Sequence, residues 1–283
     1  MKVLFLFVFF SGLAISAFSV DLQIAEDSLE IYHREMSLTH SDAVKDSLSS
    51  LMKVLFVSTF SDPKTFDYPF SKLKFSTMKS SDNRIRMFNW NIPYEDGTHR
   101  YQCFVLVREK KGEFYWWKEL TDSMKESEKM ENKFFTDDKW LGALYYEIIP
   151  MDKKNKESYT LLGWDGKDRL TTRKIIDVMT ISGKKIKFGA GIFKGDDGTK
   201  KRVIMEYSDE VSSSVKYFSR KKCIVVDHLS PKNPNMIGIY ADYGPDGSYD
   251  MYTLVKGKWE KSDNVDVKQF TEDDNKPFMN PGK

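Results

Sequence analysis

Short strand-like runs separated by turn signals occupy the chain from about Phe66 onward, and this pattern constrains the fold more than any other feature. The runs are rich in β-branched and aromatic residues and recur roughly every ten to fifteen residues. They cover residues 84–91, 100–107, 113–120, 144–149, 159–164, 173–181, 201–208, 215–218, 223–228, 248–255 and 256–260. Between them lie Asp96-Gly97, Lys111-Gly112, Asp165-Gly166, Ser182-Gly183, Asp197-Gly198 and Asp246-Gly247.

Tight turns of this kind join antiparallel strands, whereas parallel strands need long crossovers. The pattern therefore predicts a mainly β fold, an antiparallel meander arranged as a sandwich, a barrel or a strongly curled sheet. The alternative is a β-propeller, because Gly163-Trp164-Asp165-Gly166 is similar to a blade motif. The turns do not follow a regular period of about forty residues, which weighs against that alternative.

Residues 20–62 have a different sequence pattern, in which apolar residues recur at helical spacing. The first series is Leu22, Ala25, Leu29, Tyr32 and Met36, and the second is Val44, Leu48, Leu51 and Leu55. Ser41-Asp42 is a suitable start for the second helix, and Asp62-Pro63 marks a stop beyond it. The sequence thus predicts an N-terminal helical hairpin packed on an antiparallel β domain (63–263), in one cooperative unit.

Three further structural expectations follow from local composition. Ser123 to Phe135, rich in Glu, Lys and Met, predicts a short surface helix, and the polar segment 264–283 predicts a frayed tail. The expected core residues are Phe88, Trp90, Phe104, Leu106, Ile148, Leu161, Ile176, Val203, Met205, Val225 and Tyr252.

The first nineteen residues have the form of a secretory signal. Lys2 precedes the apolar run Val3 to Phe10, and Ala17-Phe18-Ser19 places small residues where a signal peptidase cleaves. The run is shorter than a membrane span, and no comparable apolar segment follows it. We therefore expect an exported protein without an integral membrane span, located in the periplasm or at the outer-membrane periphery, or alternatively outside the cell.

Charge and cysteine content exclude several classes. The formal net charge is +2, with both signs interleaved along the chain, so the basic stripe typical of nucleic-acid-binding proteins is missing. Cys103 and Cys223 are the only cysteines. They form either one disulfide or two separate buried thiols, and two cysteines are too few for a disulfide scaffold or a four-cysteine zinc site.

No established catalytic or cofactor motif is present in the sequence. The four histidines lack the spacing of a helical metal site, and neither a nucleophile elbow nor a glycine-rich phosphate loop occurs. We therefore expect neither a cofactor nor a metal. Asp242, Asp246 and Asp250 suit a surface calcium site, but Pro245-Asp246-Gly247 is first of all a turn sequence.

The remaining candidates form a possible binding or catalytic set. They are Trp90, His99, Trp164, Asp165, Asp227, His228, Tyr243 and Asp246. The aromatic members suit glycan or peptide binding, and the titratable members suit acid–base chemistry if they converge at one end of the sheet. The competing prediction is that Asp96, Asp165 and Asp246 fix turns by accepting hydrogen bonds from nearby backbone N–H groups.

Five phrases resemble a family of exported proteins from Bacteroidota. They are FDYPFSKLK (66–74), FNWNIPYEDGTH (88–99), YTLLGWDGKD (159–168), VVDHLSP (225–231) and YGPDGSYD (243–250). The resemblance covers most of the chain after the signal and implies residence in the periplasm or near the outer membrane, without catalytic residues to carry over.

Together these features predict a non-enzymatic binding or assembly protein whose partner is another protein of the cell envelope. One specific version is an accessory or plug-like subunit of an outer-membrane protein-export channel. The alternative is a secreted hydrolase or glycan-binding protein.

Overall fold

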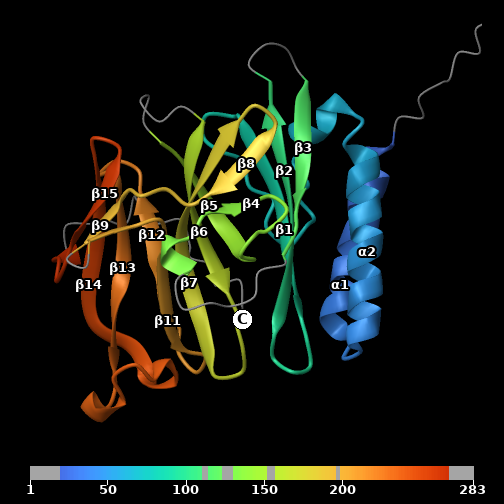
Figure 1. Ribbon diagram of the computed structural model, residues 1–283. Coiled ribbons are helices and arrows are strands. Elements are labelled where there is room, and N and C mark those ends of the chain that lie inside the picture. The colour runs from blue at the N-terminus through green and yellow to red at the C-terminus, as the bar shows by residue number, and fades with distance from the viewer. Residues whose placement is uncertain (1–19, 110–113, 123–129, 152–156, 196–197, 268–283) are drawn as a thin grey trace, which may run out of the picture.

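The computed structural model describes residues 20–109, 114–122, 130–151, 157–195 and 198–267. The expected signal (1–19), the Lys111-Gly112 turn and the tail from residue 268 lie outside these ranges. The described chain forms four layers, from the helices on the right of Figure 1 to the last strands on the left. The layers follow the sequence order except at residues 193–200, which join the last layer before residues 203–208 return to the third.

The first layer is a helical hairpin of α1 (Leu22–Leu38) and α2 (Asp42–Thr59). Asp21 caps α1, and the Ser41 hydroxyl caps α2 by accepting a hydrogen bond from the N–H of Val44, as the sequence predicts. A 3₁₀ turn, η1 (Pro63–Phe66), follows. Among the described residues, none of the helices combines the length and the apolar character needed to cross a membrane.

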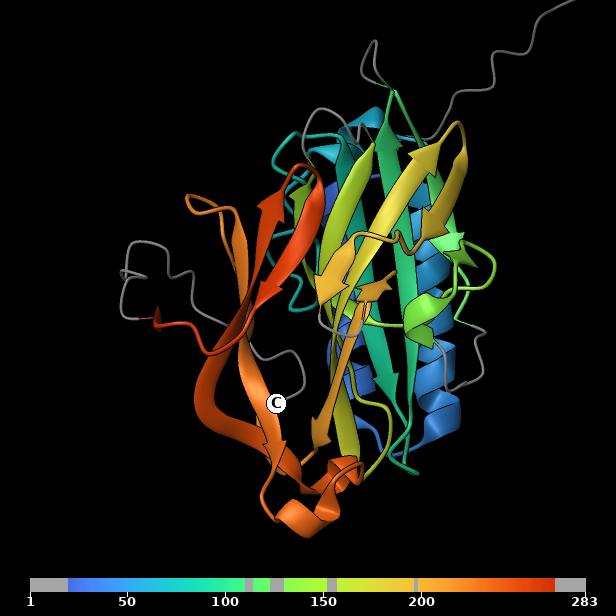
Figure 2. The same cartoon turned by 60° about the vertical axis from the view of Figure 1, so that its left-hand side comes forward.

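The next three layers are sheets. The first sheet has the order β1 (Ile85–Pro93), β2 (His99–Arg108) and β3 (Tyr115–Leu120). The central sheet has the order β4 (Phe135–Thr136), β8 (Lys185–Phe188), β7 (Thr171–Ser182), β6 (Ser158–Asp165) and β5 (Leu144–Pro150), with β11 (Val203–Ser208) also paired to β7. The outer sheet has the order β10 (Gly198–Lys200), β9 (Phe193–Gly195), β15 (Lys258–Ser262), β14 (Tyr243–Val255), β13 (Cys223–Pro231) and β12 (Val215–Phe218). Figure 2 shows the sheets stacked face to face.

Each interface between layers is an apolar core. Phe56, Phe88 and Phe104 pack between the helices and the first sheet, and Met87, Leu161 and Met179 between the first and central sheets. Leu162, Ile224 and Tyr252 pack between the central and outer sheets. Because β1, β2, β6 and β7 are covered on both faces, they are buried along almost their whole length rather than on alternate residues.

At least one hydrogen bond crosses each interface. The indole N–H of Trp90 donates to the Ser49 hydroxyl of α2 at 2.9 Å. The Asn89 side chain accepts from the N–H of Tyr145 in β5 at 2.6 Å. The indole N–H of Trp259 donates to the Thr160 hydroxyl at 2.9 Å. These hydrogen bonds satisfy buried polar groups and fix the position of one layer on the next.

The structure confirms the mainly β fold with an N-terminal helical hairpin, and it is a stack of sheets rather than a propeller. The propeller alternative is wrong. One pair, β15 with β9, is parallel, so the sheets are not strictly antiparallel. Ten of the eleven expected core residues are buried, and Met205 is half-buried at the edge of its cluster.

Two local predictions need correction, and one alternative that the sequence left open is decided. Asp246-Gly247 does not join two strands: it lies inside β14, where the pairing with β13 shifts register between Asp227 and Leu229. Of the helix expected over Ser123 to Phe135, residues 123–129 lie outside the described ranges, Met130–Asn132 form a 3₁₀ turn (η2), and Phe135 begins β4. Cys103 in β2 and Cys223 in β13 are both buried and do not form a disulfide, because two cores separate their sheets.

Candidate functional site

Three of the predicted residues, His99, Trp164 and Asp165, lie where the first and central sheets end together. We call this region the junction. The His99 ring packs edge-on against Trp164 with centroids 5.2 Å apart, and its Nδ1 lies 3.1 Å from the Asn91 amide nitrogen. A Cβ on Gly166 would lie only 2.4 Å from His99 Nε2, so the β6–β7 turn requires glycine there. Burial lowers the pKa of His99 below its ordinary value.

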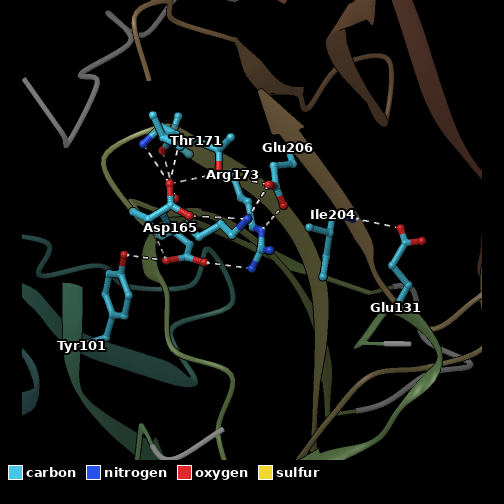
Figure 3. A network of polar contacts seen from close by, with 11 residues as sticks. Tyr101, Glu131, Asp165, Thr171, Arg173, Ile204 and Glu206 are labelled. Carbon is cyan, nitrogen blue, oxygen red and sulfur yellow. Dashed lines mark hydrogen bonds and ion pairs between the residues drawn. The ribbon is translucent and has the colours of Figure 1, made fainter. Parts of the chain in front are cut away.

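Asp165 lies between two neighbours in Figure 3. Its carboxylate accepts a hydrogen bond from the buried Tyr101 hydroxyl at 3.0 Å and approaches the Arg173 guanidinium at 3.7 Å. The same carboxylate accepts from the N–H of Lys167 at 3.0 Å, which is the turn-fixing role that the sequence predicts. Burial, followed by the Asp165 charge, raises the pKa of Tyr101 well above its ordinary value.

Glu206 on β11 extends this network (Figure 3). It accepts from Arg173 at 2.7 Å, from Lys167 at 2.5 Å and from the Thr171 hydroxyl at 3.0 Å. Burial would raise the pKa of Glu206, but the hydrogen bonds from Lys167 and Arg173 outweigh burial and lower it. The network therefore stabilises the fold, because its charged groups are already held by one another.

Asp122 is a carboxylate at this junction that the sequence analysis missed. It accepts from the backbone N–H of Tyr101 at 2.9 Å. Burial raises the pKa of Asp122 to about 6, the N–H of Tyr101 opposes that rise, and the Asp165 charge adds to it. No sequence motif indicates Asp122, because it is the pairing of β3 with β2 that brings it beside Tyr101.

A second polar group lies on the outer sheet. His228 Nδ1 lies 3.0 Å from the Asp250 carboxylate, and its Nε2 lies 3.9 Å from Asp246. Lys261 approaches Asp250 at 2.9 Å. Asp227 points elsewhere, accepting from the N–H of Ser214 at 2.6 Å, and burial raises its pKa.

The predicted titratable residues thus fall into two groups on different sheets. His99 and Asp165 belong to the junction, whereas Asp227, His228 and Asp246 belong to the outer sheet. Trp90 is a core residue that binds Ser49. The three aspartates proposed for calcium have separate roles, and the described residues contain no group of His, Cys, Asp and Glu arranged to hold a metal.

Two cavities occur among the described residues, and one of them shares Lys261 with the polar group on the outer sheet. One of about 140 Å³ beside β9 and β10 is lined by Phe193, Lys194, Gly195, Gly198, Lys200, Val203, Tyr252 and Lys261. One of about 280 Å³ beside α1 is lined by Glu30, His33, Arg34, Ser37, Leu38 and Lys74. None of the residues predicted to bind or catalyse lines either cavity.

The strongest candidate site is the loop between β13 and β14, residues 232–242, at the lower end of the stack in Figure 1. It exposes Ile237 by 76%, Ile239 by 52% and Tyr240 by 45%. Eight consecutive residues, 234–241, carry no charge in a chain in which 30% of residues are charged. Large apolar side chains grouped on an exposed loop are typical of a protein-binding site.

Internal hydrogen bonds hold the loop in one conformation. The N–H of Asn233 donates to the Asp242 carboxylate at 2.8 Å, and the N–H of Gly238 donates to the Tyr243 hydroxyl at 3.1 Å. Two 3₁₀ turns, η4 (Pro234–Met236) and η5 (Tyr240–Asp242), supply further backbone bonds. A loop already ordered in the free protein loses little conformational entropy when it binds.

The base of the loop is acidic. Asp242 ends the loop, and Asp246 follows it in β14. Lys232 is the basic residue of the loop itself. Asp246 accepts from both the N–H and the hydroxyl of Ser248, and these bonds lower its pKa, so its charge is retained at neutral pH.

Sequence reasoning found the base of this site and missed its tip. Tyr243, Asp246 and His228 were among the predicted residues, but Ile237, Ile239 and Tyr240 were not. The absence of charge over residues 234–241 was a usable signal. YGPDG (243–247) has the stronger turn chemistry, whereas the true turn precedes it.

Comparisons with known proteins give no further identification: no family model, no curated protein and no solved structure matches this chain.

Proposed function

We propose that this chain is an exported, non-enzymatic binding or assembly protein of the cell envelope, and that the 232–242 loop is the element with which it engages another envelope protein. The observation that carries the proposal is the ordered, uncharged loop tip with three exposed apolar side chains. Ile and Tyr projecting from a rigid loop have the character of interface anchors, which fill a pocket on the partner and exclude water there.

The charges around the loop tip indicate which charges the partner's surface should carry. An acidic base favours a partner whose apolar pocket is bordered by Lys or Arg, because complementary charges steer the encounter and disfavour wrong partners. The expected secretory signal and the resemblance to exported Bacteroidota proteins support an envelope location. A narrower form of the proposal is an accessory or plug-like subunit of an outer-membrane protein-export channel.

The test is site-specific photo-crosslinking in intact cells that export the protein. A photoreactive residue at Ile239 should give one discrete adduct with an envelope protein, and its yield should fall as salt is raised. The matched control places the same photoreactive residue at Leu170 in the β6–β7 turn, where no such adduct is expected. Leu170 is also apolar and is more exposed than Ile239 (68% against 52%).

A second variant separates binding from folding. Ile237→Ser with Ile239→Ser should abolish the adduct formed from a photoreactive residue at Tyr240, while the melting temperature stays the same, because exposed side chains contribute little to stability. Equal adducts from Ile239 and Leu170, or none from either, would overturn the proposal.

A further inference from the structure

The two helices expose a second apolar surface on the side that faces away from the first sheet. It contains Ile24, Ile31, Leu38, Val44, Leu51, Val54 and Val57. The buried residues of α2, among them Met52 and Phe56, lie on the opposite side of that helix. We call these seven residues the outer hairpin face.

Charge is missing where a solvent-facing helix normally carries it. The exposed residues of α2 are Ala43, Val44, Ser47, Ser50, Leu51, Val54, Val57 and Ser58, and none of them is charged. The charged residues of α2 (Asp42, Lys45, Asp46 and Lys53) are buried or half-buried. A surface helix of a monomer has the reverse arrangement, with its charges outward.

The serines on this face are already satisfied. The Ser47 hydroxyl donates to the carbonyl of Ala43 at 2.9 Å, and the Ser50 hydroxyl donates to that of Asp46 at 2.8 Å. Covering them with another surface therefore leaves no hydroxyl without a partner, and the penalty for burying a polar group is small.

We propose that a second copy of this chain covers the outer hairpin face, with the two hairpins packed antiparallel about a two-fold axis as a four-helix bundle. This inference concerns a different surface from the 232–242 loop and is independent of the function proposed above. It joins two chains into a dimer that presents two loops.

The spacing of exposed, uncharged residues on the two helices places the axis. Ile24, Ile31 and Leu38 are seven residues apart, and Ala43, Ser47, Ser50, Val54 and Val57 follow the alternating four-and-three spacing of a coiled-coil seam. The first series is centred on Ile31 and the second on Ser50. Ile31 lies seven residues before the end of α1 and Ser50 eight residues after the start of α2, so both lie at nearly the same height in the hairpin. A single two-fold axis can therefore pass close to both Ile31 and Ser50.

Charge and area agree with a second copy as the occupant. The α2 part of the face, centred on Ser50, contains no charged side chain, so two copies oppose no like charges there. Helices of 17 and 18 residues are about 26 Å long, and two side by side are about 20 Å wide. The face thus buries about 500 Å² per copy, and a total of about 1,000 Å² reaches the lower limit for a specific interface.

The first experiment is cysteine crosslinking of the purified protein under mild oxidation. Ser50→Cys should form a disulfide between copies, because Ser50 faces its own counterpart. Ser47→Cys should not, because Ser47 faces Val54 of the other copy. Leu170→Cys is the exposed control away from the face, and the native cysteines are buried at 0% and 1% exposure and do not compete.

The second experiment is sedimentation velocity over a concentration series. The wild-type protein should sediment as a dimer, and Val54→Glu should weaken the dimer by roughly a hundredfold because it buries an unpaired charge at the seam. Leu170→Glu should leave the dimer unchanged. Circular dichroism establishes that each variant is folded.

Three results would overturn the inference. A wild-type protein that is monomeric at every concentration shows that the face has another occupant or none. A dimer that survives Val54→Glu uses another surface. Crosslinking of Ser47→Cys as strong as that of Ser50→Cys shows a parallel arrangement, which excludes the proposed axis.

Discussion

The interior of the central sheet and the outer face of α2 differ in a way opposite to the usual distribution of charge. Inside, Arg202 and Asp177 form an ion pair at 2.9 Å with exposures of 0% and 1%. Outside, the exposed residues of α2 include no charged side chain. This interior ion pair is explained by the fold, whereas the uncharged outer face of α2 is not. We therefore expect the exposed apolar surfaces of this protein to be its binding sites, and the buried polar groups to serve the fold.

The largest expected effect comes from breaking the interior pair. Arg202→Met removes the partner of Asp177 and the donor to the carbonyl of Lys133, and should lower the free energy of unfolding by about 3–5 kcal/mol. Burial already raises the pKa of Asp177, so the loss should be smaller at acidic pH, where the carboxylate is protonated. Chemical denaturation at two pH values measures both effects.

The matched control is Arg100→Met, which removes a pair between half-exposed side chains, Arg100 and Asp46 at 3.3 Å. It should change stability by less than about 1 kcal/mol. If both variants lose the same free energy of unfolding, the buried ion pair stabilises the protein no more than the half-exposed pair does, which would contradict the prediction.

The two faces of α2 provide the next prediction. Phe56→Ala empties a fully buried position between the hairpin and the first sheet and should destabilise the protein by about 3–5 kcal/mol. Val54→Ala, two residues away and 69% exposed, should change stability by less than about 0.5 kcal/mol in the monomer. Urea unfolding at low protein concentration measures both, and a large loss for Val54→Ala at that concentration would show that its face is covered within one chain.

The smallest effect, of opposite sign, is expected at Asp122. Its pKa of about 6 in the fold exceeds its ordinary value of 3.8, so the folded state binds its proton more tightly than the unfolded state. The stabilisation of the folded state by protonated Asp122 is therefore complete at pH values below the ordinary pKa, and it is lost as the pH rises through about 6. Asp122→Asn removes this loss and should raise stability at pH 7 by about 1 kcal/mol, or about 2–4 °C in melting temperature.

The measurement is the melting temperature of both proteins at pH 4 and pH 7. The difference should be clear at pH 7 and small at pH 4, because the amide oxygen of Asn can still accept from the N–H of Tyr101. A lower melting temperature for the variant at pH 7 would mean that the ionised carboxylate stabilises the junction.

Much of the local structure was predictable because it depends on neighbours in sequence. The strand ends, the cap at Ser41 and the turn-fixing roles of Asp96 and Asp165 follow from side chains within three residues of the backbone they contact. The predicted turn at Asp246-Gly247 failed despite good turn chemistry. Gly247 does adopt a positive φ of 91°, but it does so within β14, because β13 continues to Pro231 and pairs with Tyr243.

By itself the sequence determined most of the elements: two amphipathic helices, the strands other than the short β4, β8, β9 and β10, and most of the core residues. Only the tertiary structure decided that the sheets stack in three layers, that Trp90 binds Ser49 instead of a ligand, and that the candidate polar residues separate into two groups. It also decided which apolar face of α2 is buried. The physical reason is that helical spacing defines two apolar stripes on α2, but burial depends on which one meets the first sheet, and that contact joins residues far apart in the chain.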